Sequence, residues 1–306
     1  MKQYIARRFA YSLLSLLLLS LTIFLFIRLT GDPTTLLTEP GASEEDIAAI
    51  QQKFGLDKPI WVQYAYFMGS LLQGDLGESF YYQTSVAELY LSRLPNSLLL
   101  AAVAMSFSLL LGIPSGILAA VQVGRFWDSA GKLFALLGLS LPSFLVGLLL
   151  ILFFSVYLEW LPSSGSGTLM HLLMPAFALG WYFAAAHMRL TRSSMLEVMG
   201  SEYVKLARLK GLSEFRVITK HAFKNALIPV LTLAGINLIN MINVAVVVET
   251  VFAWPGIGRL LYEGISFRDF PVVQGVVIIG GSMIVVVNLL VDIVYAAIDP
   301  RIRLEK

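Results

Sequence analysis

Cysteine is absent from this chain of 306 residues, and charged residues are scarce. Without cysteine the protein has no disulfide bond, no thiolate metal site and no cysteine nucleophile. Asp, Glu, Lys and Arg make up 14% of the residues, whereas soluble globular domains have about 25%. With 57% apolar residues and a mean hydropathy of +0.77, a chain of this length cannot hide its apolar surface from water, so lipid must surround it.

Motifs for catalysis and nucleotide binding are also missing. No G-x-x-x-x-G-K-[ST] loop occurs, and the nearest candidate, at 131–133, lacks the upstream glycine and the hydroxyl residue. His171, His187 and His221 form no H-E-x-x-H or other closely spaced set of metal ligands. GIPSG at 112–116 differs from the G-x-S-x-G of serine hydrolases, and its Pro and Gly fit a kink and close helix packing. We therefore predict a protein that is not an enzyme and that binds no cofactor or metal itself.

Long apolar runs are what the sequence has instead. Each of six runs is long enough to cross a hydrocarbon core of about 30 Å as a helix. They cover residues 9–27, 97–122, 133–158, 172–190, 226–248 and 272–298. The first follows Lys2, Arg7 and Arg8 like a signal peptide, but its apolar core is longer and no small-residue cleavage site follows. We therefore expect an all-α membrane protein with one domain and six spans.

Lysine and arginine decide the orientation of these spans. If the N-terminus is cytoplasmic, that side receives 16 of the 22 basic residues: three before the first span, two at 123–132, eight at 189–225 and three after the last span. The other six fall outside. Both termini are therefore expected in the cytoplasm.

The segment at 30–96 is longer than a simple loop between the first two spans needs to be. We expect it to form an external helical insert. SEEDIAAIQQKFGL begins with Ser43, a suitable N-cap. PIWVQYAYFMGSLL starts with Pro59 at a plausible first helical position, is too short to span, and has aromatic residues that suit the membrane interface. From Arg28 to Arg93 there are nine acidic and four basic residues. This acidic face is either a solvated cap or a docking surface.

Polar residues inside the spans are few. Asn237, Asn240 and Asn243 recur every three residues in the fifth span, and His187 lies in the fourth. They either hydrogen-bond between helices or line a polar path, and we take them as candidate pathway-lining residues. Asp292 in the sixth span would suit proton coupling, but it lies near the cytoplasmic end and has no second intramembrane carboxylate as a partner.

The loop at 191–225 is the most basic segment. Ser201 is a suitable N-cap for a helix from Glu202 to Lys210, and Gly211 would end it. Ser213 would cap a second helix. Its expected apolar face comprises Phe215, Ile218, Ala222 and Ala226, and its separate basic stripe comprises Arg216, Lys220 and Lys224. This elbow would lie on anionic lipid, merely satisfy the positive-inside distribution, or dock a cytosolic partner.

EYVKLARLKGL, followed by HAFKNALIPV, resembles the cytoplasmic loop of ABC-importer permeases of the peptide and nickel branch, of the B-type in dipeptide and oligopeptide systems. The general signature is E-A-A, three residues, Gly, and a later I-x-L-P. Ala207 and Gly211 match it, Lys205 replaces the Glu, and Phe223-Lys224 stand where Leu-Pro would be. These departures resemble the peptide branch, whose form is closer to Y-V-R-T-A-R-A-K-G-L. Further resembling stretches lie at 31–33, 54–64, 74–80, 139–144, 160–165, 189–198, 246–275 and 287–303.

The resemblance implies a permease subunit in a bacterial inner membrane that imports peptides or similar small polar solutes. It implies a second, similar permease that completes the pathway, two cytosolic ATPase subunits that bind ATP and Mg, an external substrate-binding protein, and no nucleic acid partner. The ATPase would dock on about 202–225. The docking residues would be Glu202, Tyr203, Lys205, Ala207, Arg208, Lys210 and Gly211. The alternative, an ATP-independent secondary transporter or channel, needs a carboxylate pair or a filter ring, and we find neither.

The distribution of basic residues generates a test of topology. Single cysteines replacing Ile50, Arg125, Gly165, Arg208 or Arg303 in this cysteine-free chain would report the side of each segment. Only those at 50 and 165 should react with an impermeant thiol reagent added outside, because the others lie in basic cytoplasmic segments. External labelling at position 208 would contradict the assigned orientation.

Overall fold

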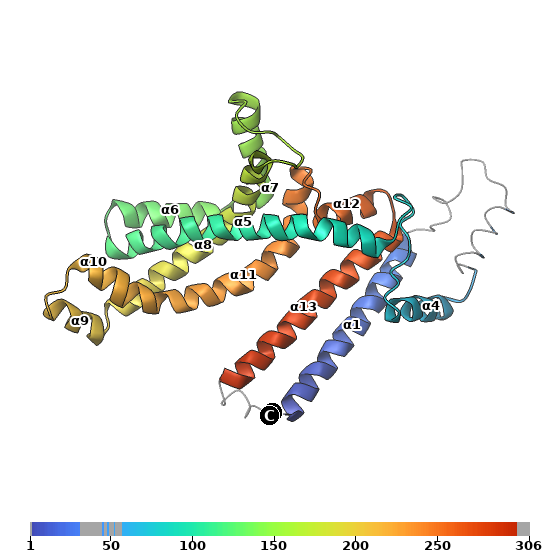
Figure 1. The fold of residues 1–306 in the computed structure, drawn as a ribbon, viewed down its shortest axis with the longest axis horizontal. Helices are drawn as coiled ribbons and strands as arrows, with labels where there is room; N and C mark the ends of the chain where they lie inside the picture. Colours follow the sequence, from blue (N-terminus) through green and yellow to red (C-terminus); the bar gives the residue numbers. More distant parts are fainter. Residues whose placement is uncertain (1, 31–44, 46–47, 49–51, 53–56, 299–306) are drawn as a thin grey trace. The chain divides into compact units, whose positions relative to one another are not determined.

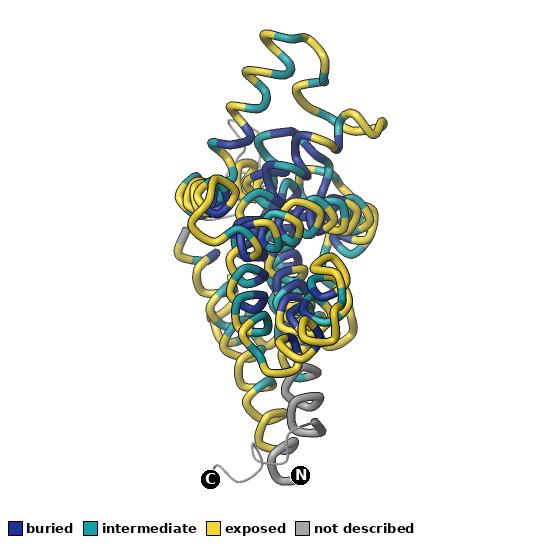
Figure 2. The backbone as a smooth tube through the Cα atoms, turned by 90° about the vertical axis from the view of Figure 1, so that its left-hand side faces the viewer, coloured by how far each residue is buried: buried dark blue, intermediate teal, exposed yellow. Residues whose placement is uncertain are grey.

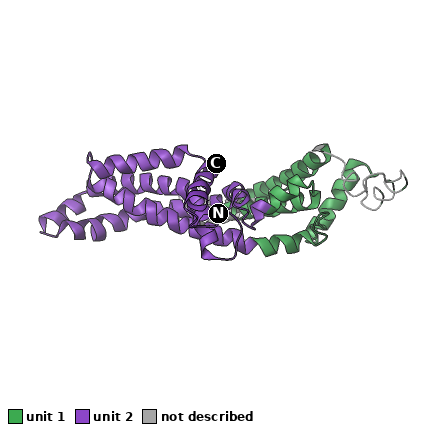
Figure 3. Cartoon of the chain, turned by 90° about the horizontal axis from the view of Figure 1, so that it is seen from above, with its two compact units in different colours: residues 1–93, 260–306 green, residues 94–259 purple. Residues whose placement is uncertain are grey.

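The structure, a computed structural model, describes residues 2–30, 45, 48, 52 and 57–298 (Figure 1). Within those residues the regular elements are helices, and the only β-type pairing is an isolated bridge between Glu78 and Ser85. The all-α prediction is confirmed. The helix expected to start at Ser43 lies almost entirely outside the described residues. The chain forms two compact units, residues 1–93 with 260–306 and residues 94–259 (Figure 3).

In the first unit, α1 (Lys2–Thr30) packs along α13 (Phe270–Ile298). The short helix α4 (Ile60–Leu72) rests on α1 through rings, with the centroid of Phe24 lying 5.3 Å from that of Tyr64. The hydroxyls of Tyr64 and Ser20 are 2.9 Å apart. Pro59 is the N-cap of α4, one residue before the position expected for it. α4 packs on α1 in this way and, with 13 residues, is shorter than a helix that spans a membrane.

In the second unit, α5 (Val86–Val121) and α8 (Leu169–Met199) approach to backbone contact. A Cβ added to Gly180 would lie 2.6 Å from the carbonyl oxygen of Ala104, and one added to Gly112 would lie 2.7 Å from that of Ala184. Neither backbone atom can move aside, so these positions require glycine. This confirms the interpretation of the 112–116 stretch as close packing, which is how small residues join helices in lipid.

The segment expected as a single helix over 133–158 is broken in the structure. α6 (Phe126–Ser140) ends with Leu141 as its C-cap. α7 (Ser143–Leu150) starts after Pro142 and continues as the π-helical η1 (Ile151–Tyr157). The two parts meet at 104°. The cause is Pro142, which holds Leu141 in an extended conformation with φ −89° and ψ 123°.

The number of membrane crossings stays a prediction. Four helices of the described residues are long and apolar enough to cross, and the bent pair makes a fifth if it is one span. α13 is a further apolar helix of 29 residues. Large apolar side chains such as Leu110 and Leu136 are exposed. Exposed and buried residues alternate around the helical turns (Figure 2). This distribution agrees with lipid as the surrounding solvent.

The loop expected at 191–225 is mostly helical. α8 continues to Met199, well past the expected residue 190. α9 (Glu202–Leu209) follows, and then α10 (Glu214–Arg216), the π-helical η2 (Val217–Ala222) and α11 (Phe223–Val251) succeed one another without a break. The expected second elbow helix is therefore the beginning of α11. The last element before α13 is α12 (Ile257–Ser266).

Candidate functional site

The elbow between α8 and α11 is built around the inner face of α9. Val204 and Ala207 are buried there against Val217, with Val198 and Leu212 at the margin. Of the seven expected docking residues, six are exposed and Ala207 is buried. The small side chain of Ala207 allows α9 to pack closely on η2.

Gly211 makes the turn that ends α9. Its φ of +75° lies in the left-handed region, and a Cβ there would meet nothing within 4 Å. Its N–H donates to the carbonyl of Arg208 at 2.9 Å. Glycine is required here for backbone conformation and not for close approach.

Side chains hold this turn from both ends. The guanidinium of Arg208 reaches across it to Glu214, with Nε–Oε1 at 2.9 Å and Nη2–Oε2 at 3.4 Å. The amide of Asn225 on α11 donates to the hydroxyl of Tyr203 at 2.8 Å. Each exposed ion pair contributes about 0–1 kcal/mol. These contacts supplement the packing of Val204 and Ala207 that orders the elbow.

The outer surface of the elbow is apolar with a basic margin. Leu209 and Phe215 are 84% and 76% exposed, and Leu206 is exposed beside Lys205 and Lys210. Of the four residues expected on one apolar face, Ala222 and Ala226 are buried, whereas Phe215 is exposed. Val217 is buried instead, because the π-helical turn η2 changes the angular spacing of side chains. An exposed apolar surface of this kind is typical of protein contacts.

The four candidate pathway residues divide into two environments. His187 and Asn237 are buried together: Ser108 Oγ lies 2.6 Å from His187 Nδ1, and Asn237 Nδ2 lies 3.3 Å from His187 Nε2. Asn240 and Asn243 are exposed on α11. Three residues advance a helix by about 300°, so each Asn is rotated by about 60° from the one before, and Asn237 faces the bundle while Asn240 and Asn243 do not.

A buried carboxylate that the sequence interpretation missed joins α6 to α8. Asp128 accepts from Lys132 Nζ at 2.9 Å, Arg192 Nε at 2.8 Å and the N–H of Gly124 at 2.9 Å. The bond from Arg192 is the main cause that lowers the pKa of Asp128 well below its ordinary range. The i,i+4 spacing of Asp128 and Lys132 was the available signal.

A second buried carboxylate, Glu249, organises the WPGIG turn. Ser97 Oγ donates to Glu249 Oε1 at 2.6 Å, and the N–H of Arg259 donates to Oε2 at 3.1 Å. Ser97 Oγ also accepts from the N–H of Ile257 at 2.8 Å. The indole of Trp254 donates to the carbonyl of Asn96 at 3.0 Å. These bonds tie the turn that follows α11 to α5, which explains the polar residues of this stretch without catalysis.

In the first unit, the loop at 74–85 is bound to the end of α12. Asp269 is buried and accepts from the hydroxyl of Ser79 and from the N–H of Tyr81. The hydroxyl of Tyr82 donates to Glu263 Oε2 at 2.6 Å. Burial, followed by this hydrogen bond, raises the pKa of Tyr82 to about 12, so the hydroxyl stays a donor at physiological pH.

Comparison with known proteins agrees with this architecture. Residues 112–304 match the family described as binding-protein-dependent transport system inner membrane component, and residues 1–101 match its N-terminal companion. The glutathione transport system permease protein GsiC of Salmonella choleraesuis (strain SC-B67) is 40% identical over 304 residues, 99% of each chain. GsiC of Escherichia coli (strain K12) is 38% identical with the same coverage.

Solved structures share the fold. An inward-facing crystal form of the MetNI methionine ABC transporter matches with a TM-score of 0.50 at 18% identity, over 67% of this chain and 97% of that one. An amino acid ABC transporter crystallised with histidines matches with a TM-score of 0.50 at 14% identity, over 67% and 92%.

The family match and the full-length relatives identify a permease subunit of the ABC importer family, and the helical fold agrees with this class. The chain belongs to the family of binding-protein-dependent transport system inner membrane components, and it is a protein of the inner membrane like its relatives. Family membership implies ATPase and substrate-binding-protein partners. It disfavours the alternative of an ATP-independent secondary transporter.

The Asp128 ion pairs generate a prediction of stability. Because the folded pKa lies below the ordinary value of 3.8, the pairs stabilise the native state above pH 3.8, and acidification removes this contribution. Asp128→Asn should lower the thermal unfolding midpoint of the detergent-solubilised chain at pH 7. The difference between the unfolding midpoints of the variant and the wild type should narrow as the pH falls below 3.8.

Glu202→Gln is the matched control, because Glu202 pairs with Lys205 at 2.8 Å on the exposed surface. Its midpoint should stay close to that of the wild type. An Asp128→Asn midpoint that equals the Glu202→Gln midpoint at pH 7 would show that the buried pairs do not stabilise the fold.

Proposed function

We propose that the chain forms half of the translocation pathway of an ATP-driven importer for glutathione, peptides or similar small polar solutes. A second permease completes the pathway, two cytosolic ATPase subunits supply the energy, and an external binding protein delivers the substrate. The observation that carries this proposal is the elbow, with its exposed apolar outer surface and basic margin. The glutathione assignment of full-length relatives supports the class of substrate.

The elbow is suited to transmit movement from an ATPase. α9 is attached to α8 through the short connection at Gly200-Ser201, and it is packed on η2 through Val204, Ala207 and Val217. A force on the exposed Leu206 and Leu209 therefore reaches both α8 and α11. The chain itself needs no cofactor in this scheme, since ATP and Mg bind to the ATPase subunits.

The exposed side of α11 is the proposed pathway surface. Asn240 and Asn243 lie on it, and their amides offer donors and acceptors to a peptide-like solute. His187 and Asn237 lie behind it, in contact with each other and with Ser108. In this proposal the first pair contacts substrate and the second pair positions α11 against α5 and α8.

Energy coupling gives the direct test of the function. The chain, co-expressed with its partners and reconstituted in vesicles, should import labelled glutathione or a dipeptide only with hydrolysable ATP and the binding protein. The isolated chain should show no ATPase activity, because it has no phosphate-binding loop. Uptake driven by a proton or sodium gradient without ATP would contradict the proposal.

Gly211 gives the test of the elbow as the ATPase contact. Gly211→Leu forces a side chain into a left-handed turn, a strain of about 1–3 kcal/mol, and should uncouple ATP hydrolysis from transport or release the ATPase. Gly200→Leu is the matched control, since Gly200 has φ −79° and its Cβ would meet only ordinary contacts at 3.5 Å. Co-purification of the ATPase and the transport rate are the measurements.

A triple variant, Arg216→Gln with Lys220→Gln and Lys224→Gln, tests the competing roles of the elbow. If the elbow only anchors to lipid or sets topology, this charge removal should impair transport and Gly211→Leu should be tolerated. A silent glycine change combined with a damaging triple change would refute ATPase docking at 202–225.

A further inference from the structure

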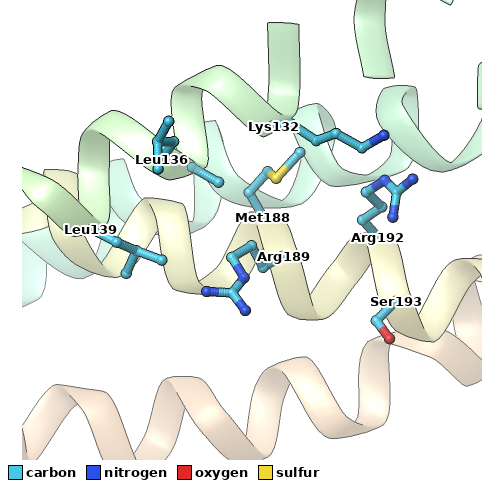
Figure 4. Close-up of a pocket in the computed structure, with 8 residues that line it drawn as sticks. Lys132, Leu136, Leu139, Met188, Arg189, Arg192 and Ser193 are labelled. Atoms are coloured by element: carbon cyan, nitrogen blue, oxygen red, sulfur yellow. The ribbon is translucent and has the colours of Figure 1, made fainter. Parts of the chain in front are cut away.

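A cavity of about 430 Å³ opens between α6 and α8 in the second unit (Figure 4). One part of its lining is cationic and the other is apolar. The cationic residues are Lys132, Arg189 and Arg192, and the main apolar residues are Leu136, Leu139 and Met188. A charged margin beside an apolar floor fits a ligand that is itself amphipathic.

The charge of the cavity favours an anion. Three cations line it, and Asp128 pairs with two of them, Lys132 and Arg192, so these four groups have a net charge of +2. Asp128 holds Lys132 and the Nε edge of Arg192 in place, and the other edge of the Arg192 guanidinium is available to a further acceptor. Arg189 is exposed and forms no ion pair with any described residue.

The position of the cavity along its helices indicates a lipid headgroup. Phe126 and Trp127, at the start of α6, are exposed, and such aromatic residues mark the membrane interface. About two to three turns further along, Leu133, Leu136 and Leu137 are exposed apolar residues at the level expected for acyl chains. The distribution of basic residues assigns this end of α6 to the cytoplasmic side.

We propose that this cavity binds an anionic phospholipid of the cytoplasmic leaflet. The phosphate would accept charge-assisted hydrogen bonds from Arg189 and Arg192, with Lys132 beside it, and the first part of an acyl chain would lie on Leu136 and Leu139. A free phosphate ion would satisfy the same cations but would leave the apolar floor uncovered. The proposal does not depend on the substrate or on the ATPase contact.

Arg189→Gln is the variant that tests it, because Lys132 and Arg192 are needed to neutralise Asp128 and Arg189 is not. The full-length chain in a neutral detergent is titrated with dioleoylphosphatidylglycerol or dioleoylphosphatidylcholine, and native mass spectrometry counts the bound lipids. The wild type should prefer phosphatidylglycerol. Arg189→Gln should bind it about five-fold more weakly, the factor for one basic residue near an anionic lipid surface.

Arg125→Gln is the matched control, since Arg125 is exposed at the same end of α6 but does not line the cavity. Arg125→Gln should keep the wild-type preference for phosphatidylglycerol. If Arg125→Gln weakened phosphatidylglycerol binding as much as Arg189→Gln, general surface charge would explain the binding and the proposal would be overturned. Equal binding of the two lipids, or competition by glycerol 1-phosphate as strong as by phosphatidylglycerol, would also overturn it. Loss of lipid binding in the complex with the second permease would also overturn the proposal, because the cavity would then lie in an interface between subunits.

Discussion

The backbone contact between α5 and α8 is the constraint on which the second unit depends. In lipid, apolar side chains gain little by leaving their solvent, so helices associate through close packing and polar bonds. Gly112 and Gly180 allow that approach, and Ser108 then reaches His187 at 2.6 Å. α8 also packs against α6, α7 and α11. The contact between α5 and α8 therefore fixes the position of the helix against which the other three pack.

Buried carboxylates add ion pairs and hydrogen bonds between segments that already pack together. Asp128 joins α6 to α8, and Glu249 joins the turn after α11 to α5, each with partners for both oxygens. A charge inside a membrane protein is costly unless it is paired, so each carboxylate specifies one arrangement of the helices around it. The elbow is different, because its ion pair between Arg208 and Glu214 is exposed and its order comes from the packing of Val204 and Ala207.

Much of this fold could be predicted from hydropathy, because apolar length is a direct measure of what a membrane helix needs. Gly211 as the end of α9 could also be predicted, since glycine adopts a left-handed turn without the steric cost of a side chain. The break at Pro142 could not, because the apolar run continues through it unchanged. The pairing of Asp128 with Lys132 could have been predicted from their i,i+4 spacing, but the pairing with Arg192 on α8 could not, because the sequence does not show which helices pack together. The burial of Asn237 beside His187 depends on a neighbouring helix in the same way.

The break between α6 and α7 also restricts where this part of the chain can lie. A helix end leaves its last carbonyls and the next helix's first N–H groups without intrahelical partners, and a bend of 104° separates the two sets. Hydrocarbon offers them no hydrogen bond. The stretch around Leu141 and Pro142 is partly exposed and therefore needs water or polar groups beside it, which an unbroken apolar helix does not.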